Sequence, residues 1–261
     1  MPNIVVLVKQ VPDTWSERKL ADDDFTLDRD SADAVLDEIN ENAVEAALKL
    51  KEEHGGNVTV ATIGPERAVE ALRKALSMGA DDAVILSDDA LAGSDAVQTA
   101  WALSTVIDAI GDVDVIITGN ASTDGGTGTV PAVLGVYRGL PVLTHMRSVA
   151  IDGSTVTGER ETEDGIHQLK ANLPAIVSVT EKANEPRFAS FKGIMAAKKK
   201  PVRELTLADV AAEAEQVGLE NAATSVTAAT PKPPKSAGER INDEGDAGVK
   251  LAGFLKAQKF I

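Results

Sequence analysis

Short apolar runs alternate with longer amphipathic segments along the first half of the chain. Apolar runs without polar alternation are typical of buried strands, and we expect four, at residues 3–8, 57–63, 83–86 and 114–118. Apolar residues at helical spacing predict a helix after each strand, over 42–53, from Pro65 to Met78, from an N-cap at Ser94 to Ile110, and up to Tyr137. This alternation predicts an α/β fold with a doubly wound, mostly parallel sheet covered by helices on both faces.

The pattern changes after residue 141. VAIDGSTVTGERE predicts a β-hairpin around Asp152-Gly153, because Asp-Gly is a strong turn signal. IHQLKANL and AIVSVTE are two further strand-like runs. Together these segments predict an antiparallel extension of the sheet.

The C-terminal part differs in composition from the rest, and we place the end of the α/β domain at residue 203. LTLADVAAEA predicts a short helix, and TSVTAATPKPPKSAGERINDEGD is rich in Pro, Ser, Thr, Gly and charge. Such a composition is typical of an extended arm that runs over a surface. The last residues, GVKLAGFLKAQKFI, return to a helical pattern. We therefore expect 204–261 to form an arm and a terminal helix that docks on a partner subunit.

Composition excludes several classes of function. The chain has no cysteine, which excludes disulfides and thiolate chemistry, and His54, His145 and His167 show no metal-ligand spacing. We expect no metal site and no catalytic histidine. The formal net charge of -15 disfavours nucleic acid as a partner. MPNIVVLVKQ does not have the pattern of a secretory signal and the apolar runs are too short for a membrane helix, so we expect a cytoplasmic protein.

The segment DVIITGNASTDGGTGTVPAVLG (114–135) is the best candidate for a binding site. A buried strand leads through a glycine-rich turn into a helix, which is an arrangement that cradles phosphate on backbone N–H groups. Ser122, Thr123, Thr127 and Thr129 add hydroxyl groups. The turn matches neither GxxxxGK[ST] nor GxGxxG, so the residues predict nucleotide binding without triphosphate hydrolysis. A flexible turn without a ligand is the alternative.

The stretch NEPRFASFKGIMAAKKKPVR (184–203) carries six basic residues and one acidic residue, next to Phe188, Phe191, Ile194 and Met195. It is one short loop-like piece of an otherwise acidic chain. The residues alone favour an interpretation in which both phenylalanines belong to the core and the lysines end a solvated helix.

Over nearly its whole length the chain resembles the β subunit of electron-transfer flavoproteins, in an actinobacterial, non-bifurcating version. The matching segments are VLVKQVPDT (6–14), IGPERAVEALRKALSMGAD (63–81), GNASTDGGTGT (119–129) and NEPRFASFKGIMAAKKK (184–200). The resemblance implies a sheet of the adenine-nucleotide-binding type and a heterodimer with an α subunit that holds most of the FAD contacts. It also implies a structural AMP in the β subunit and no catalytic acid, base or nucleophile. KQVPDT also occurs in bifurcating relatives that bind a second FAD in place of AMP, and this alternative stays open.

The resemblance implies roles for named positions. In AMP binding these are Leu7, Asp37, Glu38, Ile39, Asn40, Ile63, Gly119, Asn120, Ala121, Ser122, Thr123, Asp124, Gly125, Gly126, Thr127, Gly128, Thr129 and Val130. Thr14, Ile39 and Glu161 are expected near the FAD, and Asp124 is expected to accept hydrogen bonds from loop N–H groups. In partner recognition the positions are Glu185, Pro186, Arg187, Phe191, Ile194, Met195, Lys198, Lys199 and Lys200.

The resemblance implies an electron carrier in fatty acid oxidation. Its recognition loop would dock acyl-CoA and other flavoprotein dehydrogenases, with Phe191 as the apolar anchor, while Phe188 stays in the core. Electrons would then pass to a membrane quinone oxidoreductase. A stand-alone nucleotide-binding regulatory protein is the alternative, but it leaves the recognition loop and the C-terminal arm without a purpose.

Overall fold

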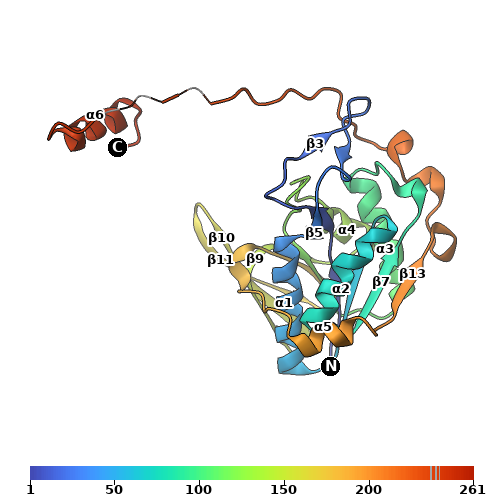
Figure 1. Cartoon of the computed structure of the whole chain (residues 1–261). Helices are drawn as coiled ribbons and strands as arrows, with labels where there is room; N and C mark the ends of the chain where they lie inside the picture. The colour runs from blue at the N-terminus through green and yellow to red at the C-terminus, as the bar shows by residue number, and fades with distance from the viewer. Residues whose placement is uncertain (236, 239, 241) are drawn as a thin grey trace. The chain divides into compact units, whose positions relative to one another are not determined.

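The computed structural model describes residues 1–261 apart from residues 236, 239 and 241. The described chain divides into two units, Met1–Thr227 and Ala228–Ile261 (Figure 1). The second unit contains helix α6 (Ala247–Ala257), in agreement with the helical pattern of the last residues. The predicted arm includes the three residues that lie outside the described part.

One nine-stranded sheet organises the first unit. Its strands are β1 (Asn3–Leu7), β6 (Asn57–Ile63), β7 (Asp82–Leu86), β8 (Val115–Gly119), β9 (Val142–Asp152), β10 (Thr155–Thr162), β11 (Gly165–Asn172), β12 (Ala175–Val179) and β13 (Val202–Leu205). They lie in the order β11-β10-β9-β12-β8-β1-β6-β7-β13. In this spatial order, β9, β12, β8, β1, β6, β7 and β13 run parallel to one another. β10 pairs antiparallel with β9, and β11 pairs antiparallel with β10 at the edge of the sheet. The predicted α/β class and mostly parallel sheet are confirmed.

The prediction that AIVSVTE belongs to the antiparallel extension is wrong. These residues form β12, which lies between β8 and β9 and is parallel to both. All five residues of β12 are buried, as expected for a central strand covered on both faces. The run has no polar alternation, and this feature already favoured a parallel strand over an exposed antiparallel one.

Helices cover both faces of the sheet (Figure 1). Their bounds are α1 (Glu38–His54), α2 (Val69–Met78), α3 (Ala96–Ile110), α4 (Val130–Arg138) and α5 (Phe191–Ala197). Short 3-10 turns lie at Glu66–Ala68, Asp89–Leu91, Glu181–Ala183, Leu207–Asp209, Ala214–Gln216 and Leu219–Asn221. No helix in the described part of the chain combines the length and the apolar character needed to cross a bilayer.

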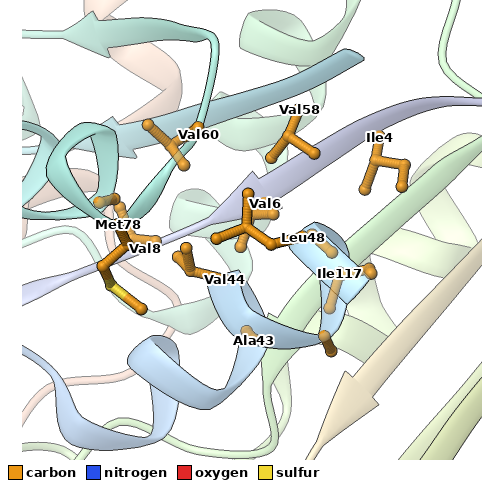
Figure 2. Close-up of a cluster of buried hydrophobic side chains, with 14 of the residues drawn as sticks. Ile4, Val6, Val8, Ala43, Val44, Leu48, Val58, Val60, Met78 and Ile117 are labelled. Atoms are coloured by element: carbon orange, nitrogen blue, oxygen red, sulfur yellow. The ribbon is translucent and has the colours of Figure 1, made fainter. Parts of the chain in front are cut away.

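Two aliphatic clusters form the core, one on each face of the sheet. Alternate residues of β1 divide between them: Ile4 and Val6 pack with α1 and α2, whereas Val5 and Leu7 pack with α3 and α4. Figure 2 shows the first cluster, in which the α1 side chains Val44 and Leu48 meet the β1 strand. This division follows from the alternation of side chains along a strand and fixes the sheet between its two helical layers.

The chain reverses its direction across the sheet at β1. From β1 it proceeds outward through α1, β6, α2 and β7, and it then returns through α3 to β8, on the other side of β1. Leu7 of β1 pairs with Thr118 of β8 at the carboxyl ends of both strands. Open α/β sheets bind ligands at such a reversal point, so this edge is where a site is expected.

The compact unit continues past the expected limit at residue 203. β13 joins the sheet edge beside β7, and Leu207, Ala212 and Val217 are buried in the core. LTLADVAAEA forms only a 3-10 turn at Leu207–Asp209 where an α-helix is predicted. Helix α3 is capped by Asp95, not by Ser94, because the Asp95 carboxylate accepts hydrogen bonds from the N–H groups of Val97 and Gln98.

Candidate functional site

The glycine-rich loop connects β8 to α4 at the reversal point of the sheet. It begins at Gly119, where a Cβ atom would lie 2.6 Å from Asn40 Nδ2 and 3.1 Å from Ile39 Cγ2. Only glycine therefore allows the loop to pass so close to the start of α1. Gly126 and Gly128 both have φ of 63°, the left-handed conformation that glycine adopts without strain.

The loop offers unpaired polar groups at the start of α4. The amide N–H groups of Thr127, Gly128 and Thr129 have no hydrogen-bond partner among the described residues. No side chain caps α4 at its N-cap residue Thr129. Asn120 Oδ1 is buried and also lacks a partner in the described structure. A run of free amides at a helix N-terminus attracts an anion, and the orphaned Asn120 oxygen can accept a hydrogen bond from a polar ligand.

Asp37 and Asn40, both predicted to bind AMP, hold the loop in place. Asp37 is fully buried, and its Oδ2 accepts hydrogen bonds from Thr123 N at 2.7 Å and Thr123 Oγ1 at 2.8 Å. Its Oδ1 accepts one from Ile39 N and so caps α1. Asn40 Oδ1 accepts a hydrogen bond from Lys9 N at 2.7 Å. The structure thus engages both side chains in binding the loop and the end of β1 to α1.

Asp124 is the charged residue of the loop, and two cations bind it. Its carboxylate is 1% exposed and contacts Lys9 Nζ at 2.9 Å and Arg29 Nη2 at 2.8 Å. It also accepts a hydrogen bond from Gly125 N, which agrees with the expectation of a bond to a loop N–H. Burial raises the pKa of this carboxyl, but the charge of Lys9 and the contact with Arg29 outweigh burial and hold the pKa well below its usual range.

Sequence reasoning missed Lys9 and Arg29. Lys9 follows the first strand directly, and a cation at the carboxyl end of a strand beside the reversal point is a usable signal. Arg29 has no such signal, because 95 residues separate it from Asp124. A third cation, Arg18, donates a hydrogen bond from Nη1 to Thr123 O at 2.6 Å.

The other predicted AMP and FAD positions lie around the same edge. Leu7 is buried at the end of β1, and Ile63 ends β6 half-buried. Thr14 Oγ1 donates to Glu38 Oε1 at 3.0 Å, which joins the loop after β2 (Gln10–Pro12) to the first turn of α1. Ile39 lies in the first turn of α1, close to Gly119 at the end of β8. These positions therefore gather within the described site.

Glu161 lies apart from this group, on β10. Its carboxylate contacts Lys182 Nζ at 3.0 Å and Arg147 Nη1 at 3.4 Å. The hydrogen bond from Lys182 lowers the pKa of this exposed carboxyl below its usual value. Glu161 therefore lies between two basic side chains on the β10 side of the sheet.

Residues 184–200, the predicted recognition segment, are anchored on α1. Arg187 contacts the buried Glu45 through Nε at 2.7 Å and Nη2 at 3.1 Å, and Glu52 through Nη1 at 2.6 Å. Asn42 and Asn184 exchange side-chain to main-chain hydrogen bonds at 2.7 and 3.0 Å. Among the predicted recognition residues, Arg187 therefore positions the segment.

The second half of the segment is not a loop but helix α5, which packs on the end of α2. Ser190 caps it by accepting a hydrogen bond from Gly193 N at 3.0 Å. Gly193 lies so close to α2 that a Cβ atom would come within 2.4 Å of Ser77 O. Arg73 of α2 donates to Ala197 O at 2.7 Å, and Lys200 Nζ donates to Ala80 O. These tertiary contacts support a helix too short to be stable alone.

The solvent-exposed side of residues 184–200 carries large apolar side chains. Phe191 is 79% exposed, and Ile194 and Met195 are exposed beside it on α5. Phe188 is 95% exposed, so its predicted place in the core is wrong. Lys198 and Lys199 point into solvent at the end of the helix. We call Phe188, Phe191, Ile194 and Met195 the α5 patch.

A cavity lies away from the glycine-rich loop. It has a volume of about 480 Å³ and lies at the amino ends of β1, β6 and β7, lined by Asn57, Asp82 and Arg203 among others. The loop is the better candidate site, because its free amides and the side chains of Lys9 and Arg29 converge at the carboxyl ends of the strands.

Comparison with known proteins agrees with this architecture. Residues 24–210 match the family model described as electron transfer flavoprotein domain. The chain is 60% identical to the electron transfer flavoprotein subunit beta of Mycobacterium tuberculosis (strain H37Rv), with all of both chains covered. It is 37% identical to the subunit beta of Thermoanaerobacterium thermosaccharolyticum, with 91% of each chain covered. It is 35% identical to the caffeyl-CoA reductase-Etf complex subunit CarD of Acetobacterium woodii, over 97% of this chain and 95% of CarD.

These matches confirm the resemblance drawn from the four sequence segments, and they assign the chain a role in electron transfer. They extend over the glycine-rich loop, the anchored recognition segment and the sheet that carries both. The chain therefore belongs to the β subunits of the electron transfer flavoprotein family.

Proposed function

We propose that this chain forms a heterodimer with an α subunit, binds a structural AMP, and docks flavoprotein dehydrogenases such as acyl-CoA dehydrogenases. The complex passes their electrons to a membrane quinone oxidoreductase. The observation that carries the proposal is the α5 patch: four large apolar side chains stand exposed on a segment that salt bridges and a cap hold in one conformation. Large apolar anchors on a pre-organised support are typical of binding hot spots.

The glycine-rich loop supports AMP as the resident nucleotide. The free amides of Thr127, Gly128 and Thr129 suit a phosphate, and the orphaned Asn120 Oδ1 suits a donor on the nucleoside. Lys9 and Arg29 keep positive charge beside the loop. The Lys9 ammonium pairs with Asp124 and so helps to hold the loop itself, which suits a nucleotide with a structural role.

FAD, held mainly by the α subunit, supplies the electron transfer when it is bound. Thr14 and Ile39, beside the first turn of α1, are the residues of this chain that we place near it. Lys198 and Lys199 contribute positive charge at the edge of the α5 patch and favour approach to acidic dehydrogenase surfaces, with more effect on the association rate than on final affinity.

The test is Phe191→Ala in the purified heterodimer. A central hot spot contributes about 2 kcal/mol or more, so kcat/KM for electron transfer from an acyl-CoA dehydrogenase should fall roughly 30-fold. Folding and nucleotide content should be unchanged. Ile166→Ala is the matched control, because Ile166 is also exposed but lies on β11. Equal kcat/KM in Phe191→Ala and the wild type would refute docking through the α5 patch.

A further inference from the structure

β2 and β5 (Ala34–Leu36) form a small two-stranded sheet separate from the nine-stranded one, and the chain between them makes an excursion. β2 and β5 pair antiparallel, so residues 13–33 form an excursion whose two ends lie close together. Within it, strands β3 (Lys19–Leu20) and β4 (Leu27–Asp28) pair over two residues each. A two-residue pairing with exposed β3 side chains is too short to hold the excursion in place by itself.

Both arms of this excursion bind neighbouring residues of the glycine-rich loop. Arg18, just before β3, donates to Thr123 O, and Arg29, just after β4, contacts Asp124 Oδ2. The other carboxylate oxygen of Asp124 contacts Lys9 at the end of β1. One buried carboxylate therefore joins three segments that are far apart in the sequence.

The Asp124 contacts are the strongest of those that hold the excursion. Loss of Arg29 leaves the buried Asp124 carboxylate with Lys9 as its remaining cation among the described residues, which costs more than loss of an exposed pair. The excursion also has an exposed pair, Asp30 with Arg67 at 2.5 Å, in which the Asp30 side chain lies almost entirely in solvent. Solvent screens this pair, so it contributes little.

The loop is thereby held from two directions. Asp37 binds Thr123 from the start of α1, and Arg29 and Lys9 bind Asp124 from the excursion and from β1. The free amides at residues 127–129 begin three residues after Asp124, beyond Gly125 and Gly126. A ligand on the amides is therefore held by a loop that cannot shift while the Asp124 contacts persist.

We propose that Asp124, with Lys9 and Arg29, is a latch that positions the glycine-rich loop and retains its bound nucleotide. The inference rests on the proposed AMP site and adds a function for residues that bind the loop and not the nucleotide. The latch sets how fast AMP leaves. Its loss removes none of the amide groups but lets the loop that carries them move away from the excursion.

The experiment measures release of radiolabelled AMP from the purified heterodimer after addition of excess unlabelled AMP. Asp124→Asn and Arg29→Gln should each release AMP at least about tenfold faster than the wild type, a change that corresponds to only about 1.4 kcal/mol. Arg29→Lys keeps the positive charge and should restore slow release in large part. Arg67→Gln is the matched control, since it removes the exposed pair of the same excursion, and it should release AMP at the wild-type rate.

The outcomes separate the latch from the AMP site. If the wild type contains no AMP, the proposed function fails and the latch fails with it. If the wild type contains AMP but Asp124→Asn and Arg29→Gln release it at the wild-type rate or more slowly, only the latch is refuted. Should Asp124→Asn fail to fold, the comparison of Arg29→Gln with Arg29→Lys decides the question alone.

Discussion

The ion pair between Arg187 and Glu45 provides a quantitative test of how firmly residues 184–200 are anchored on α1. The Glu45 side chain is 5% exposed and accepts two hydrogen bonds from the Arg187 guanidinium and one from the Arg187 main-chain N–H; its other cation, Lys49, is 3.9 Å away. Arg187→Met would leave this carboxylate buried and poorly paired. Fully buried pairs cost about 3–5 kcal/mol when one partner is lost. Because the Arg187 side chain is 33% exposed and water can reach the site, we expect a loss of about 2 kcal/mol.

The assay is urea unfolding of the heterodimer and of its variants, followed by circular dichroism. Glu52→Gln is the control, because Glu52 contacts the same guanidinium but is mostly exposed, and it should change the free energy of unfolding by about 0.5 kcal/mol or less. The double variant Arg187→Met with Glu45→Gln should recover part of the loss, since no charge is then left unpaired. A loss below about 0.5 kcal/mol for Arg187→Met would refute the buried anchor.

Three further predictions follow from the site. The pKa of Asp124 is depressed in the folded state, so this carboxylate stabilises the fold above its ordinary unfolded pKa of about 3.9, and the stabilisation is lost as the pH falls below that value. The stabilities of the wild type and Asp124→Asn in acid unfolding should therefore converge at low pH. Gly193→Ala should lower stability by about 1–3 kcal/mol in thermal or urea unfolding, because its Cβ would overlap Ser77 O. Gly119→Ala should reduce AMP content after chromatography, because its Cβ would displace Asn40; unchanged content would contradict the close packing at that point.

The strands of the sheet could be predicted because a local run of apolar residues marks each of them in the sequence. The run at 57–63 matches β6 residue for residue, and the glycine-rich turn lies where a buried strand meets a helix. The residues of a strand do not determine which strands pair with it, and for this reason AIVSV is wrongly predicted to lie in the antiparallel extension. Its position depends on which strands lie beside it, a long-range property.

The site was predictable only in part, for the same reason. The loop residues could be found, but Arg29 reaches Asp124 across 95 residues, and Arg187 reaches Glu45 across 142. Helix α5 depends on the close approach of Gly193 to α2, and no local pattern encodes that contact. Phe188 was placed in the core because a large aromatic residue is usually buried, whereas the anchored segment holds it in solvent.

The nucleotide content of the heterodimer tests the central claim most directly. The complex would be co-expressed with its α subunit, denatured in acid, and its released nucleotides separated and counted by chromatography. The account predicts one FAD and one AMP per heterodimer, with the AMP on the glycine-rich loop. Two FAD and no AMP would contradict it and would assign the loop to a second flavin.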